Sequence, residues 1–169
     1  QLGMSGDLQG CIRVIEEVMA STPGFGFGHG ALLVSHHYLG NRDKAIAALA
    51  NNFRALMNFP EAAQAVEAVY AEGDYAGAFL RAAEMLEERS QTIHVGPLAI
   101  GNMYAYAGEV EKAIDWYEQG VRITGPGVPY LGLTHCEKDG ILVNSIGSGT
   151  ADIVALMALG AGDRNMRKL

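Results

Sequence analysis

The sequence predicts an all-α, right-handed solenoid of helix-turn-helix repeats that ends in a C-terminal capping segment. The first observation is a recurring turn glycine, because Gly6, Gly40, Gly73 and Gly108 are spaced by 34, 33 and 35 residues. The second is that the same classes of residue follow each glycine. A period of about 34 residues is typical of solenoids built from helix pairs. Such solenoids bury a continuous core between neighbouring repeats and expose an extended inner surface.

The helix after each turn glycine is the most regular element of the repeat. A capping residue comes first, at Asp7, Asn41, Asp74 or Glu109. Five residues after the glycine stands a small side chain followed by a bulky one, in the pairs Cys11 and Ile12, Ala45 and Ile46, Ala78 and Phe79, and Ala113 and Ile114. A small residue beside a large one lets two helices approach closely and fills the groove between them. The spacing predicts helices over 7–20, 42–56, 75–89 and 110–123.

The helix before each turn glycine is also visible in the sequence. The apolar spacing predicts these first helices over 27–39, 60–72 and 97–107. Pro60 and Pro97 stand at the start of two of them, where proline is tolerated because its missing N–H would have no partner in the helix. The predicted helices therefore alternate in pairs.

The pattern resembles the tetratricopeptide repeat. The strongest copy runs from about residue 94 to 126 and matches at Ile100, Gly101, Tyr104, Gly108, Ala113, Tyr117 and Pro126. It departs at Gly120, where that family usually has alanine, and at Pro97, where it usually has an aromatic residue. The other copies are fainter, with Leu33 and Val66 where a small residue is usual. The resemblance covers residues 1–126, which we interpret as the repeat domain, about three and a half repeats.

The two ends of the chain depart from the repeat. Residues 127–169 lose the period and are predicted to form the capping segment, with an apolar helix from Thr150 to Leu159 that covers the end of the solenoid or lies elsewhere. Within this segment, 141–146 is compatible with a short strand or an irregular stretch. At the other end the chain begins inside a repeat, as if truncated. The helix over 7–20 is then expected to expose Ile12, Ile15 and Met19 and to permit homo-oligomers.

Composition limits the classes of partner. Of the 169 residues, 49% are apolar and 18% charged, and 12 basic against 19 acidic residues give a net charge of −7. A negative net charge opposes binding to nucleic acid or to an anionic membrane surface. The sequence contains no apolar run long enough for a membrane-spanning helix. The two cysteines, Cys11 and Cys136, lack metal-site spacing and are expected to be reduced in a cytoplasmic protein.

The tetratricopeptide resemblance implies that ligands bind on the concave face, which the first helices line. The side chains expected to point inward are Val34, His37, Tyr38, Glu67, Tyr70, Asn102 and Tyr106. Tyrosines offer stiff contact area with a polar tip, although packing between the repeats alone would also account for them. The resemblance further implies that Asn102 hydrogen-bonds a ligand's backbone amide. None of the seven residues is Lys or Arg, so a clamp for a peptide's terminal carboxylate is disfavoured.

We find no pattern that predicts catalysis, a metal site or a cofactor. His36 occupies a packing position and is expected in the core, whereas the adjacent His37 is directed about 100° away on the helix and has the better claim to the groove. The glycine cluster at 24–30 follows a helix instead of a strand, which is the wrong context for a dinucleotide-binding turn. The cluster at 147–150 precedes a predicted helix but has no P-loop lysine.

The sequence therefore predicts a non-catalytic module that binds a peptide or partner protein in its concave groove, as a scaffold or sensor within a larger protein. A related alternative is the regulatory region of a signalling or transcription protein, which rests on analogy at the level of the fold. An alternative of a different class is a small-ligand-binding protein or enzyme that uses the glycine-rich segment 141–160.

Overall fold

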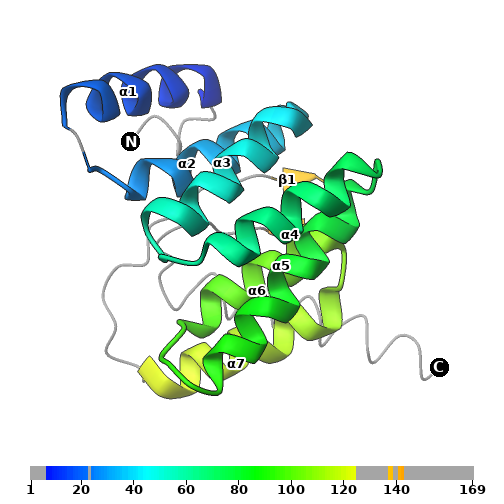
Figure 1. Cartoon of the computed structure of the whole chain (residues 1–169). Helices are drawn as coiled ribbons and strands as arrows, with labels where there is room; N and C mark the ends of the chain where they lie inside the picture. The colour runs from blue at the N-terminus through cyan, green and yellow to red at the C-terminus, as the bar shows by residue number, and fades with distance from the viewer. Residues whose placement is uncertain (1–6, 23, 125–136, 139–140, 143–169) are drawn as a thin grey trace.

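A computed structural model of the chain describes residues 7–22, 24–124, 137–138 and 141–142. Over these residues the fold is helical (Figure 1), with α1 Leu8–Ser21, α2 Phe27–Tyr38, α3 Arg42–Ala55, α4 Pro60–Ala71, α5 Tyr75–Ser90, α6 Pro97–Ala107 and α7 Val110–Thr124. Each helix bound lies within one residue of the prediction. The two-residue strands β1 (Glu137–Lys138) and β2 (Ile141–Leu142) pair antiparallel, so part of 141–146 is a strand. The predicted helix over 150–159 and the glycine cluster at 147–150 lie outside the described residues.

The turn glycines end the first helix of each pair. Gly40, Gly73 and Gly108 have φ values of 73°, 89° and 85°, a left-handed conformation that glycine adopts without the Cβ clash of other residues. The backbone N–H of Gly40 donates to the carbonyl oxygen of His37 at 3.0 Å. The backbone N–H of Asn41 donates to the carbonyl oxygen of His36 at 2.9 Å. This pair of hydrogen bonds is a Schellman motif, which satisfies the last carbonyls of α2. Gly6 lies outside the described residues.

The predicted capping residues behave unequally. The carboxylates of Asp7 and Asp74 accept hydrogen bonds from the amides of Gly10 and Gly77, at 2.8 Å and 2.7 Å, which confirms them as N-caps. Asn41 occupies the N-cap position of α3 as predicted, but its side chain makes no capping hydrogen bond. The side-chain nitrogen of Asn41, Nδ2, instead lies 3.5 Å from Nδ1 of His36. His36 is buried, as expected.

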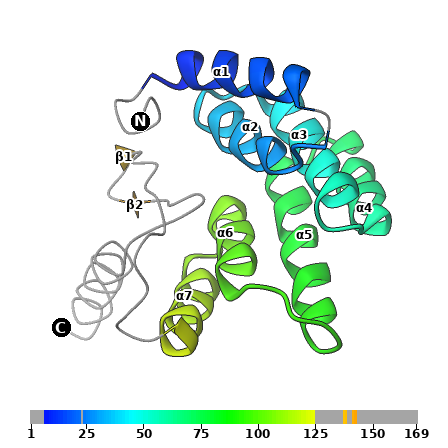
Figure 2. The ribbon, with the colours of Figure 1, turned by 90° about the vertical axis from the view of Figure 1, so that its left-hand side faces the viewer.

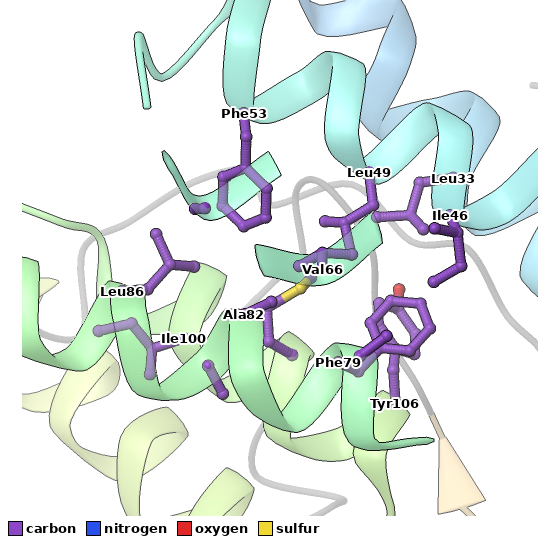
Figure 3. Close-up of a cluster of buried hydrophobic side chains, with 14 of the residues drawn as sticks. Leu33, Ile46, Leu49, Phe53, Val66, Phe79, Ala82, Leu86, Ile100 and Tyr106 are labelled. Atoms are coloured by element: carbon purple, nitrogen blue, oxygen red, sulfur yellow. The ribbon is translucent and has the colours of Figure 1, made fainter. Parts of the chain in front are cut away.

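The core forms where consecutive helices pack in chain order. The small residues Ala45, Ala78 and Ala113 are buried together with the bulky residues that follow them, Ile46, Phe79 and Ile114, as the close-packing pattern predicts. Figure 3 shows part of this core, in which Leu49 of α3 lies near Leu33 of α2 and Val66 of α4, and Leu86 of α5 lies near Ile100 of α6. Buried apolar side chains therefore link α2 through α6 into one cluster.

Helix α1 corrects one expectation. Ile12 is only 7% exposed, and Ile15 and Met19 lie against α2 at Gly28, whose missing side chain leaves room for them. Of the three residues expected to form an uncovered face, Ile12 is therefore buried and Ile15 and Met19 are half-buried, because α2 packs against them. The exposed apolar residues of α1 are instead Val14 and Val18. Homo-oligomer formation stays a prediction.

The array of helices curves so that α2 and α6 meet. In Figure 2 these two helices lie on one side of α3 and α5, and α4 lies on the other. The rings of His37 on α2 and Tyr106 on α6 are 4.6 Å apart between centroids. Among the described helices none has the length and apolar content needed to cross a membrane.

Candidate functional site

A pocket of about 250 Å³ lies between α2 and α6, with α3 and α5 at its base. Its lining is Phe27, Gly30, Leu33 and Val34 of α2, Leu49, Asn52, Phe53, Leu56 and Met57 of α3 and the turn after it, Leu86 of α5, and Ala99, Asn102, Met103 and Tyr106 of α6. Helix α4 contributes no residue to this lining. We call this pocket the slot.

The slot is elongated and open at one end. Its lining spans 27–34 on α2 and 99–106 on α6, which corresponds to about 10 Å along each helix axis. At one end Phe27 is 60% exposed and Leu56 41% exposed, so apolar surface surrounds the opening. At the other end Val34 and Tyr106 are buried, and the contact between His37 and Tyr106 closes the slot.

Two asparagines supply the polar part of the lining, and none of the lining residues carries a charge. The side-chain oxygen of Asn102 accepts a hydrogen bond of 2.8 Å from the hydroxyl of Tyr117, which fixes the carboxamide, and its NH₂ group donates to no described residue. The side chain of Asn52 makes no hydrogen bond with any described residue. Both carboxamides can therefore donate to a bound carbonyl oxygen, and that of Asn52 can also accept from an N–H.

An aromatic cluster forms the closed end of the slot. His37 lies among Tyr38, Tyr75, Phe79 and Tyr106, and its Nδ1 is 2.9 Å from the hydroxyl of Tyr75. Burial lowers the pKa of His37 to about 4 and raises the pKa of Tyr75 to about 12. The imidazole is therefore neutral near pH 7, while the guanidinium of Arg42 lies over the Tyr75 ring, 5.2 Å from its centroid.

The hydroxyl of Tyr106 is the one buried side-chain oxygen of the described residues without a hydrogen-bond partner. Burial raises the pKa of Tyr106 well above its usual range, so the phenol stays protonated. In Figure 3 its ring lies against Phe79 and its hydroxyl points away from α6. The ring packs as core, whereas its edge lines the slot.

The structure gathers some of the predicted site residues and separates others. Val34, Asn102 and Tyr106 line the slot, and His37 and Tyr38 lie in the aromatic cluster beside it. Glu67 and Tyr70, both on α4, lie elsewhere. Glu67 forms an ion pair of 2.5 Å with Arg54, and the hydroxyl of Tyr70 donates to Asp43 at 2.5 Å. These contacts hold the two side chains against α3, so α4 does not complete a wall with α2 and α6. Their role in binding a partner stays a prediction.

Comparison with known proteins identifies no relative. No family model, curated protein or solved structure matches this chain. The residues of the slot are therefore the basis for any assignment of its function.

Sequence reasoning did not find Asn52, Phe27 or Leu56. It assigned the ligand-binding surface to the first helices, whereas α3 is a second helix and forms much of the base of the slot. One signal was present in the sequence. Asn52 lies on the same face of α3 as Leu49 and Phe53, and a polar residue within an apolar stripe indicates either a buried hydrogen bond or a binding site.

The slot is lined by apolar side chains and two carboxamides. Its lining contains no carboxylate, thiol, amine or imidazole. Among the described residues no three metal-ligating side chains come together. The slot can exclude water from an apolar group and hydrogen-bond a neutral one.

We predict that Gly101→Ala destabilises the protein and disturbs the slot. A Cβ at Gly101 would lie 2.6 Å from Cε1 of Tyr117, whose ring is buried and whose hydroxyl is held by Asn102. Overpacking costs about 1–3 kcal/mol and the gain in helix propensity is about 1 kcal/mol, so we expect a net loss of up to about 2 kcal/mol in urea denaturation.

Gly120→Ala is the matched control for this prediction. Its new methyl group would meet the flexible end of Leu98 at 3.2 Å, so the same propensity gain applies without a rigid clash. We expect Gly120→Ala to be neutral or stabilising. If the two substitutions changed the free energy of unfolding equally, the close packing of Tyr117 against Gly101 would not be what makes alanine unfavourable at position 101.

Proposed function

We propose that the chain is a tetratricopeptide-like solenoid that acts as a non-catalytic interaction module and binds a peptide or partner protein on its inner wall. We expect it to serve as a cytoplasmic scaffold or sensor. The repeated helix pairs, their left-handed turn glycines and the buried small-then-large residue pairs support the repeat assignment. The resemblance of residues 94–126 to that family supports it independently of the structure.

The slot is the observation that carries the binding function. An apolar slot remains between α2 and α6, although residues of both helices also belong to the buried core. Exposed Phe27 and Leu56 continue this surface to the outside. Apolar anchors in a desolvated slot, with a few hydrogen bonds for orientation, are how interaction surfaces concentrate binding energy.

A random-peptide display library tests the proposal. We expect the full chain to select peptides whose binding is weakened at least about tenfold, or 1.4 kcal/mol, by Leu56→Glu, because the new carboxylate would stand at the slot opening. Val110→Glu is the matched control, since Val110 is 42% exposed, as Leu56 is at 41%, and lies outside the slot. Both changes are at exposed sites and should leave the fold intact, which circular dichroism would verify.

Two outcomes would contradict the proposal. The first is that no peptide is selected above the background of an unrelated helical protein. The second is that both glutamate variants weaken the selected peptides equally, because binding would then depend on net charge or another surface and not on the slot.

A further inference from the structure

We infer that the slot recognises an uncharged internal segment of a peptide, with one apolar side chain in the closed end and the adjoining backbone amide between Asn52 and Asn102. The inference rests on the peptide-binding function proposed above and specifies the chemistry of the partner. Three properties of the slot lead to it, namely its volume, the absence of charge in its lining, and the position of its two carboxamides.

The volume admits a side chain and excludes a helix. A cavity of about 150 Å³ holds benzene, so the 250 Å³ of the slot is enough for one large apolar side chain with part of its backbone. A helix with its side chains is about 10–12 Å in diameter and could not enter. One side chain and the backbone beside it therefore enter the slot, and the rest of the partner stays outside it.

The absence of charge selects against ionised groups. No lining residue could pair with an ionised side chain, and the histidine behind the closed end is neutral near pH 7. Burying an unpaired ion costs several kcal/mol, more than a single contact recovers. The same cost applies to a terminal carboxylate or ammonium, so the slot favours an internal stretch of chain over a chain end.

The position of the carboxamides sets the order of the two groups. Asn102 lies one helical turn before Tyr106, and Asn52 lies one turn from Leu49, so the closed end extends about 5–6 Å beyond both asparagines. That depth suits a leucine or phenylalanine side chain. Neither the NH₂ of Asn102 nor the carboxamide of Asn52 has a hydrogen-bond partner among the described residues. Both can therefore bond the peptide bond next to the bound side chain, which offers one acceptor and one donor.

NMR of the ¹⁵N-labelled full chain tests this inference with capped tripeptides. The probes are acetyl-Gly-Phe-Gly-amide and acetyl-Gly-Leu-Gly-amide, against the charged analogues with Glu or Lys in the middle. We expect millimolar binding of the apolar probes, with shifts of the side-chain NH₂ signals of Asn52 and Asn102 and of the Val34 amide. The charged analogues should bind at least about tenfold more weakly.

A filling substitution gives an independent arm. Ala99→Leu should occupy the slot and weaken the apolar probes at least about tenfold without lowering the melting temperature. Ala68→Leu makes the same change at an exposed position of α4 outside the slot and should have no effect. N-benzylacetamide carries the apolar group and a single amide without a peptide chain, and we expect it to bind more weakly than the phenylalanine probe.

The outcomes separate this inference from the proposed function. Equal binding of charged and apolar probes, or apolar probes that shift neither asparagine, would overturn the inference while library-selected peptides still support peptide binding. If N-benzylacetamide bound as tightly as the phenylalanine tripeptide or more tightly, the peptide backbone would add nothing to binding. The occupant of the slot would then be a small molecule and not a peptide. Failure of the library itself would remove the function on which the inference rests.

Discussion

Replacing Phe79 with alanine is expected to lower the free energy of unfolding by about 3–5 kcal/mol, which is the cost of removing a fully buried aromatic side chain. Phe79 is 0% exposed, and its ring centroid lies 5.6 Å from that of His37, 5.2 Å from Tyr75 and 5.3 Å from Tyr106. The cavity would open where α2, α5 and α6 meet. Because domains are stable by only about 5–15 kcal/mol, a loss of this size is easily measured by urea denaturation.

Two further variants make this prediction specific. Phe79→Leu keeps an apolar side chain in place, so we expect it to cost less than the alanine variant. Phe25→Ala removes the same ring from an exposed position and should change stability by no more than about 0.5 kcal/mol. If Phe79→Ala cost no more than Phe25→Ala, the aromatic cluster would not be the joint between α2 and α6 that the structure indicates.

The sequence was sufficient to predict the helices and much of the core. Both follow from local rules that a single repeat contains. A glycine such as Gly108 must adopt a positive φ to end α6, and a pair such as Ala78 and Phe79 must face a neighbouring helix. The same rules apply to each copy, so the helix bounds could be predicted in every repeat, and the structure confirms them to within one residue.

The arrangement of α2, α4 and α6 could not be predicted in the same way. The curvature of stacked helices depends on crossing angles that the side-chain volumes at each contact determine, and small differences accumulate from one repeat to the next. Tyr70 and His37 each lie three residues before the turn glycine of their repeat, Gly73 and Gly40. Yet Tyr70 hydrogen-bonds Asp43 on α3, whereas His37 packs against Tyr106 on α6. Equivalent positions in the repeats therefore do not share a surface.

Correct prediction of the candidate site was limited by the same cause. Val34, Asn102 and Tyr106 were found because they lie on the first helices, where the family resemblance directed attention. Asn52 was missed because only the folded arrangement shows that the face of α3 reaches the slot. A contact between helices distant in the chain has no local signal in one sequence.

Acidification from about pH 6.5 to pH 4 is expected to destabilise the protein through His37. Burial lowers the pKa of His37 in the folded state to about 4, from 6.5 in an unfolded chain. Between these two values the unfolded chain binds the proton and the folded protein does not. The contribution of the neutral imidazole is therefore complete above about pH 6.5 and is lost as the pH falls through this range.

The expected loss is about 2 kcal/mol, since a difference of 2.5 pKa units corresponds to at most about 3.4 kcal/mol and His37 is only partly buried. His36, whose pKa burial also lowers, contributes in the same direction, as do carboxylates at lower pH. Urea denaturation across the range should therefore compare the natural chain with His37→Gln, which keeps a polar partner for Tyr75 but cannot titrate. The variant should be less sensitive to pH by the stated amount, because the titrations of the other groups cancel in the comparison. Identical pH dependence of the two proteins would mean that His37 is solvated in the folded state and that the closed end of the slot admits water.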